Sequence, residues 1–167
     1  MSESTLEQRL QRLEAIEGVR AVKARYCNAC DTKDVDALRE CFIADGAVID
    51  YGPIGRFEGR DALVAVYKEL GCQPGVVDMH HVGNAEIEII DDTHARARWA
   101  LYFFTMIEGM NAVRQLGGHY EDTYRRDDGV WRMETSVFRA HSILDGHVAA
   151  GGQITWYPGG RQDAHPA

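Results

Sequence analysis

The chain of 167 residues has the length of one domain, and its 45% hydrophobic and 26% charged residues are typical of an ordinary soluble globule. Its formal net charge of −8 disfavours nucleic acid and anionic membranes as partners, because both attract basic surfaces. There is no apolar run near the roughly 18 residues of a membrane span, and no signal-peptide pattern at the start. We therefore expect a cytoplasmic protein.

Four cysteines are present, and without a secretion signal we expect them to be reduced thiols. Cys27 and Cys30 match the C-x-x-C pattern. The match lies inside a helical pattern, however, with no second pair and no histidine at zinc-finger spacing. These thiols are interpreted as packing groups of a helix rather than as a redox or metal site.

The N-terminal residues predict one long helix. A capping-box match over residues 4–7 opens it, and its second apolar stripe has Tyr26 near the centre. Gly18 is a point at which this helix could break or bend. Asp31 follows Tyr26 by five residues, about 140° further round an ideal helix. It therefore reaches the same cavity only if the helix ends or tightens there.

Shorter elements follow, and long strands fill the second half of the chain. The expected helices are 35–41, capped by Asp34, and 60–70, ended by Gly71; the expected strands are 47–51, 56–58, 82–90, 94–106, 113–126 and 130–144. Helices followed by antiparallel strands indicate an α+β fold, with the helices packed on one face of a curved sheet.

One histidine stands out on the first long strand. Alternation places His81 on the face that carries Ile87 and Ile89, whereas its neighbour His80 points the other way. A titratable ring at the rim of an apolar surface is typical of a pocket enzyme. Taken alone, His81 is more simply interpreted as a partly buried histidine bonded to a backbone carbonyl.

A cation is the second anomaly. Alternation along the last strand places Arg139 on the face that carries Trp131 and Met133. Such a cation must be paired, reach solvent past the strand end, or face a ligand.

The C-terminal residues differ in composition from the rest. We expect one domain over residues 1–148 and a Gly- and Pro-rich tail over 149–167. This composition favours disorder, but the apolar segment 154–157 is expected to pack on the sheet or against a partner subunit.

Taken together, the sequence resembles the SnoaL-like branch of the nuclear-transport-factor-2-like superfamily over about residues 8–145. The segments that carry the resemblance are Tyr26-Cys27-Asn28-Ala29-Cys30-Asp31 with Asp34 and Leu38, His81-Val82-Gly83, Gly117-Gly118-His119-Tyr120-Glu121-Asp122, Asp128-Gly129-Val130-Trp131, and Arg139. The resemblance implies a cystatin-like cone, in which three helices and a curved antiparallel sheet enclose one pocket.

Within this branch the sequence is similar to the bacterial bile-acid 7α-dehydratases. Those enzymes have a tyrosine and an aspartate at this five-residue spacing, a histidine in H-x-G, and an arginine near the end of the last strand. The matching residues are Tyr26, Asp31, His81 and Arg139. The Asp–His pair also looks like that of scytalone dehydratase and lindane dehydrochlorinase. The second active-site histidine of scytalone dehydratase has no counterpart in residues 102–110.

The resemblance implies a lyase that eliminates water from a hydroxylated, ketone-activated ring substrate, such as a steroid or bile acid, without a metal or organic cofactor. His81 would act as the base and Asp31 would orient it, while Tyr26 and Arg139 would donate hydrogen bonds to the oxyanion. The expected substrate-binding residues are Tyr51, Phe103, Met106, His119, Trp131 and Met133.

Two alternatives stay open. One is an isomerase of the ketosteroid type that uses the same dyad, and the other is a non-catalytic module for ligand binding or one resembling a dioxygenase β-subunit. From its relatives we expect a homo-oligomer, a dimer or trimer, and a small hydrophobic ring-bearing substrate.

Overall fold

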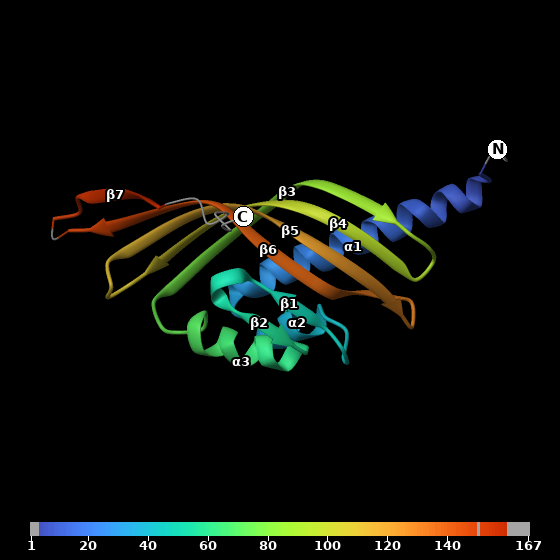
Figure 1. The fold of residues 1–167 in the computed structure, drawn as a ribbon, viewed down its shortest axis with the longest axis horizontal. Coiled ribbons are helices and arrows are strands. Elements are labelled where there is room, and N and C mark those ends of the chain that lie inside the picture. Colours follow the sequence, from blue (N-terminus) through green and yellow to red (C-terminus); the bar gives the residue numbers. More distant parts are fainter. Residues whose placement is uncertain (1–3, 150, 160–167) are drawn as a thin grey trace, which may run out of the picture.

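The computed structural model describes residues 4–149 and 151–159. In these residues one open, curved sheet has the strand order β2-β1-β6-β5-β4-β3, and β7 also pairs with β6 (Figure 1). The strands are β1 Val48–Asp50, β2 Arg56–Glu58, β3 Val76–Ile89, β4 His94–Ile107, β5 Ala112–Asp127, β6 Val130–Val148 and β7 Ile154–Gly159. Every strand pair is antiparallel except β1 with β6.

Three α-helices lie on one side of this sheet, so the predicted α+β architecture is confirmed (Figure 1). They are α1 Leu6–Thr32, α2 Val35–Glu40 and α3 Arg60–Leu70, with a short 3-10 turn, η1 Gly52–Ile54, between β1 and β2. None of the described helices combines the length and the apolar character needed to cross a bilayer.

Helix α1 runs unbroken along the sheet. Its capping box joins Thr5 and Gln8, one residue later than the sequence pattern suggested. Gly18 does not break the helix; a Cβ atom at this position would lie 2.5 Å from the Trp131 ring. The glycine therefore lets the helix backbone lie directly on the indole.

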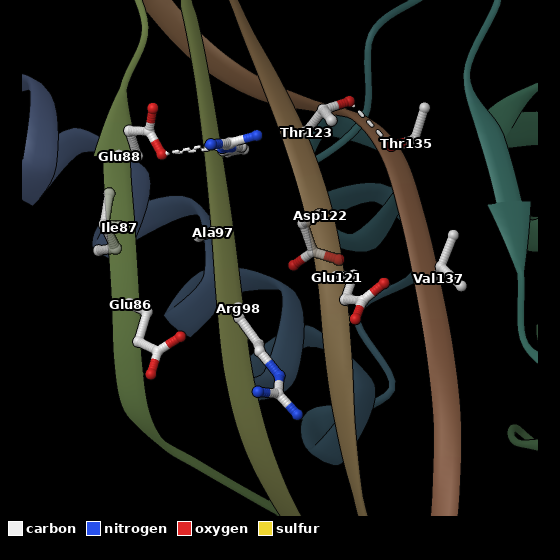
Figure 2. A pocket seen from close by; sticks show the side chains of 11 residues that line it. Glu86, Ile87, Glu88, Ala97, Arg98, Glu121, Asp122, Thr123, Thr135 and Val137 are labelled. Carbon is white, nitrogen blue, oxygen red and sulfur yellow. Dashed lines mark hydrogen bonds and ion pairs between the residues drawn. The ribbon is translucent and has the colours of Figure 1, made fainter. Parts of the chain in front are cut away.

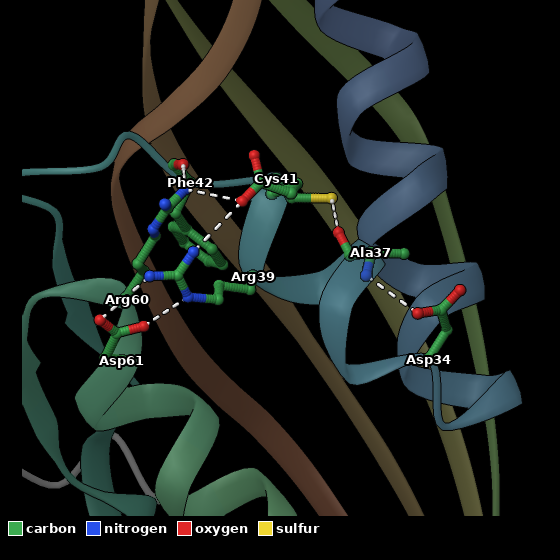
Figure 3. Close-up of polar contacts among 8 residues, drawn as sticks. Asp34, Ala37, Arg39, Cys41, Phe42, Arg60 and Asp61 are labelled. Atoms are coloured by element: carbon green, nitrogen blue, oxygen red, sulfur yellow. Dashed lines mark hydrogen bonds and ion pairs between the residues drawn. The ribbon is translucent and has the colours of Figure 1, made fainter.

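Ion pairs join the two short helices (Figure 3). The Asp34 side chain caps α2 by accepting the Ala37 N–H at 2.9 Å. Arg39 on α2 donates to Asp61 on α3 at 2.6 Å, and Arg60 donates to the Phe42 carbonyl at 3.3 Å. These contacts fix α3, which forms one wall of the pocket described below.

Three β-bulges interrupt the alternation, and the last is at His141 in β6, where Gly117 pairs with Ser142 but Gly118 pairs with Ala140. The other two decide which of the predicted site residues face the helices. In β3, Gly83 pairs with Ala100 but Glu86 pairs with Arg98, so β3 carries one extra residue, near Asn84, whose φ is 49°. In β6, an extra residue lies at Glu134, because Thr123 pairs with Thr135 while Tyr124 pairs with Met133. Each bulge exchanges the inner and outer faces of its strand.

The apolar segment 154–157 falls in β7, which pairs with the last part of β6. Residues 160–167 of the predicted tail lie outside the described residues.

Candidate active site

A pocket of about 300 Å³ lies between α1, α3 and the inner face of the sheet. Most of its lining is apolar, including Leu63, Leu101, Phe103, Leu116 and Phe138. A few polar groups converge on this apolar space, which is the usual character of a small-molecule site. They include the side chains of Tyr26, Tyr51, Tyr67, Asp78, His80, Thr105, Arg114 and Tyr120.

Asp31 and His80 form a pair at the pocket wall. Asp31 Oδ1 lies 2.6 Å from His80 Nδ1, and the two carboxylate oxygens also lie 3.1 and 3.0 Å from the His80 backbone N–H. A carboxylate accepts hydrogen bonds, so Nδ1 carries the proton and Nε2 is left as the basic nitrogen. Asp31 belongs to the last turn of α1, and Lys33, with φ 62°, ends the helix just beyond it.

The imidazole is held from a second side as well. The Phe103 ring on β4 lies 4.6 Å from the His80 ring, centroid to centroid, and the His80 side chain is only 12% exposed. Asp31 does not line the pocket itself but lies behind His80. This is the arrangement of a base and the group that orients it.

Two tyrosine hydroxyls meet deep in the pocket. The Tyr51 hydroxyl donates to the Tyr26 hydroxyl at 2.8 Å, so the Tyr26 proton is directed to another acceptor, either the neighbouring Cys30 thiol or a ligand in the pocket. Burial, followed by the proximity of Tyr51, raises the pKa of Tyr26 well above its ordinary value. Tyr26 is therefore a neutral hydrogen-bond donor throughout the ordinary pH range.

Behind the tyrosines lies a buried ion pair. Lys23 Nζ is 2.9 Å from Asp122 Oδ2, and both side chains are fully buried. Asp122 also accepts hydrogen bonds from Ser136 at 2.7 Å and from Tyr124 at 2.9 Å. The Ser136 hydroxyl also lies 3.3 Å from that of Tyr51, so these buried polar groups adjoin the pocket floor.

The predicted catalytic set is only partly brought together. Tyr26 lines the pocket and Asp31 lies at its wall, but the predictions that His81 and Arg139 face it are wrong. The bulge near Asn84 turns His80 inward and His81 outward. The bulge at Glu134 likewise turns Arg139 outward, where it pairs with Asp50 at 3.0 Å.

The predicted substrate-binding residues also divide. Tyr51 and Phe103 line the pocket, but Met106 and His119 lie on the outer face, the latter 3.3 Å from Glu121. Thr105 and Ile107 occupy the inner positions on either side of Met106. Trp131 and Met133, which were predicted to bind substrate, are instead buried in the core beyond the pocket.

Sequence reasoning missed His80, Tyr120 and the Lys23–Asp122 pair. The Gly-Asn dipeptide at 83–84 was the available signal for His80, since glycine and asparagine inside a strand pattern suggest a bulge. Lys23 interrupts an apolar helix stripe, but that position alone does not identify a partner 99 residues later in the chain.

A larger hollow, about 780 Å³, lies on the outer face of the sheet (Figure 2). The side chains that line it include Glu86, Glu88, Arg96, Arg98 and Glu121, and Arg96 pairs with Glu88 at 2.7 Å. This surface is open and charged, and it lacks the base, the orienting acid and the apolar walls of the inner pocket. In the part of the chain that the structure describes, no three His, Cys, Asp or Glu side chains gather as metal ligands.

Comparisons with known proteins agree with this architecture. Residues 11–137 match the profile of the SnoaL-like domain. A proposed scytalone dehydratase from Novosphingobium aromaticivorans superposes with a TM-score of 0.75 at 23% identity, over 85% of this chain and 94% of that one. LinA gives a TM-score of 0.75 at 17% identity, over 87% and 97% of the two chains.

The hexachlorocyclohexane dehydrochlorinase LinA-type3 from Novosphingobium barchaimii gives a TM-score of 0.70 at 16% identity, covering 89% of this chain and 92% of that one. At these identities the likeness establishes the fold alone. A comparison with curated protein sequences finds no significant match.

Proposed function

Because the chain belongs to the SnoaL-like domain family, with its cystatin-like fold, we propose that it is a cofactor-independent lyase. The proposed reaction eliminates water from a hydroxylated ring substrate activated by a ketone. The observation that carries this proposal is the Asp31–His80 pair in the wall of an apolar pocket, 2.6 Å between Oδ1 and Nδ1. The base is therefore His80 and not the His81 that the H-x-G pattern suggested.

In the proposed mechanism, Nε2 of His80 removes the acidic proton from the carbon next to the ketone. Asp31 holds the tautomer and stabilises the imidazolium that forms. The carbon–hydrogen electron pair becomes an enolate, whose oxygen accepts a hydrogen bond from Tyr26. The enolate then re-forms the ketone and expels the hydroxyl group, which leaves as water with the proton from His80. The products are a conjugated enone and water.

Two similar folds support an elimination. One of those structures is the proposed scytalone dehydratase and the other is the hexachlorocyclohexane dehydrochlorinase LinA-type3. The apolar lining suits a hydrophobic ring system, and a steroid or bile acid remains the proposed class. The cytoplasmic location and the homo-oligomer stay predictions.

The test is to incubate the protein with a panel of hydroxylated cyclic ketones and to follow product mass. Loss of one water supports the dehydratase, whereas an unchanged mass with a shifted double bond indicates the isomerase. Asp31→Asn should stay folded and lose at least about 100-fold in turnover, because the amide cannot stabilise the imidazolium. Turnover equal to wild type in this variant would refute the dyad.

A further inference from the structure

The inner face of the sheet carries a row of polar side chains that begins two residues before His80 on β3. Asp78 on β3 is the direct cross-strand partner of Thr105 on β4, and Thr105 is the partner of Arg114 on β5. Arg114 is the partner of Asp145 on β6. We call these four residues the polar row; Asp78, Thr105 and Arg114 line the pocket.

The neighbouring row, which contains His80, is otherwise apolar. His80 pairs with Phe103, which pairs with Leu116, which pairs with Ile143. A substrate in the pocket therefore contacts apolar side chains beside His80, and it meets polar side chains again at the polar row. A fully apolar molecule leaves the polar row without ligand partners.

From this geometry we propose that the pocket has a second polar subsite, built from Asp78, Thr105 and Arg114, that binds a neutral hydroxyl or carbonyl group at the far end of the substrate. The inference rests on the proposed function and specifies its substrate class. The substrate is an elongated ring system with one polar group at Tyr26 and another at the polar row.

Charges in the row favour a neutral group over an acid. Lys33 contacts the Asp78 carboxylate, and Arg114 donates to Asp145 at 2.6 and 3.0 Å, so each cation already has a carboxylate partner. The Asp78 side chain is 9% exposed and faces the pocket, where it repels a substrate carboxylate. A hydroxyl group can donate to Asp78 and accept from Thr105 or Arg114.

The spacing along the elements sets the length of the substrate. Asp78 lies two residues before His80, about 7 Å along a strand. Tyr26 lies five residues before Asp31, about 7.5 Å along a helix. Since Lys33 contacts Asp78 and Asp31 contacts His80, Tyr26 lies on the opposite side of His80 from the polar row.

The polar row and Tyr26 therefore lie on opposite sides of the base, displaced from it by about 7 Å of strand and about 7.5 Å of helix, so a ligand that reaches both needs a polar group at each end.

Binding measurements test the subsite without requiring turnover. Calorimetric titration would compare 2-naphthol with 2,6-dihydroxynaphthalene, a rigid ring system with a hydroxyl at each end. We expect the diol to bind about tenfold more tightly. A gain of only about twofold would follow simply from the fact that the symmetric diol can bind in either of two orientations. Thr105→Val and Asp78→Asn should remove this gain, so that each variant binds the diol no more than about twofold more tightly than 2-naphthol.

Thr123→Val is the matched control, because Thr123 lies on the outer face and bonds Thr135 there at 2.8 Å. It should keep the full preference for the diol. Equal affinity for the two ligands, no binding of the diol, or a gain that survives both pocket substitutions contradicts the subsite. Tighter binding of 6-hydroxy-2-naphthoic acid than of the diol contradicts its neutral character. These outcomes are independent of whether the protein dehydrates any substrate.

Discussion

Asp31 holds His80 at two points, since its carboxylate accepts both the ring N–H at Nδ1 and the backbone N–H of the same residue. The side chain that orients the imidazole thus also fixes the strand from which it projects. The end of α1 and the part of β3 before its bulge are consequently tied together at the pocket. A base held in this way needs little reorganisation before it removes a proton.

Tyr26→Phe tests the proposed oxyanion donor. The variant keeps the ring and removes the hydroxyl that Tyr51 contacts at 2.8 Å. We expect kcat to fall about 10²–10³-fold with little change in KM, because the hydrogen bond strengthens only as the enolate forms. Tyr102→Phe is the control, since Tyr102 is 49% exposed and does not line the pocket. A kcat within about twofold of wild type in Tyr26→Phe would exclude this role.

Lys23→Met tests the buried ion pair. The substitution leaves the Asp122 carboxylate in the core with only the Ser136 and Tyr124 hydroxyls as donors. The free energy of unfolding should fall by about 3–5 kcal/mol in urea titrations, because an unpaired buried charge is costly.

Adding Asp122→Asn to this variant should recover part of the loss, since the amide carries no charge. The exposed pair Arg96–Glu88 supplies the comparison: Arg96→Met should change stability by at most about 1 kcal/mol. A similarly small effect of Lys23→Met would show that the buried pair contributes little to stability.

Alkaline pH should unfold the protein cooperatively. Burial raises the pKa of Tyr26, Tyr51, Tyr120 and Tyr124 above the ordinary value of about 10. Above pH 10 these tyrosines ionise in the unfolded chain and stay protonated in the folded one, so stability is full below this pH and decreases above it. Each contributes a slope of about −1.4 kcal/mol per pH unit.

Urea titrations between about pH 9 and 11, with tyrosinate absorbance recorded in parallel, measure this effect. The absorbance should rise together with the loss of structure. Complete tyrosine ionisation in a protein that is still folded would contradict the prediction.

Local signals in the sequence predicted most of the elements. Asp34 before α2 and Gly71 after α3 marked real helix ends, and alternation located the long strands. These features depend on residues that are neighbours in the chain, so the sequence contains them. Tyr26, Tyr51 and Phe103 followed from the same patterns, helped by the family resemblance.

The sequence did not reliably predict which side chains of each strand face the pocket and which face outward. Strict alternation assigned His81 and Arg139 to the pocket, whereas one extra residue in β3 and one in β6 turned both outward. The Gly83-Asn84 dipeptide indicated the bulge in β3. The residues around Glu134 include no glycine or asparagine that would indicate the bulge there. A bulge depends on the register with a distant strand, which local periodicity does not contain.

His80 is the base of the proposed mechanism, and its neighbour His81 provides an internal control. His80→Ala and His81→Ala remove the same side chain from adjacent positions, one facing the pocket and the other exposed on the outer face. Once a dehydration product has identified a substrate, turnover should be measured for both variants. Their melting temperatures should be shown to be similar, so that a loss of turnover does not reflect unfolding. His80→Ala should lose about 10²–10⁴-fold, and His81→Ala should match wild type. Loss of turnover in His81→Ala with His80→Ala unaffected would contradict the proposed site.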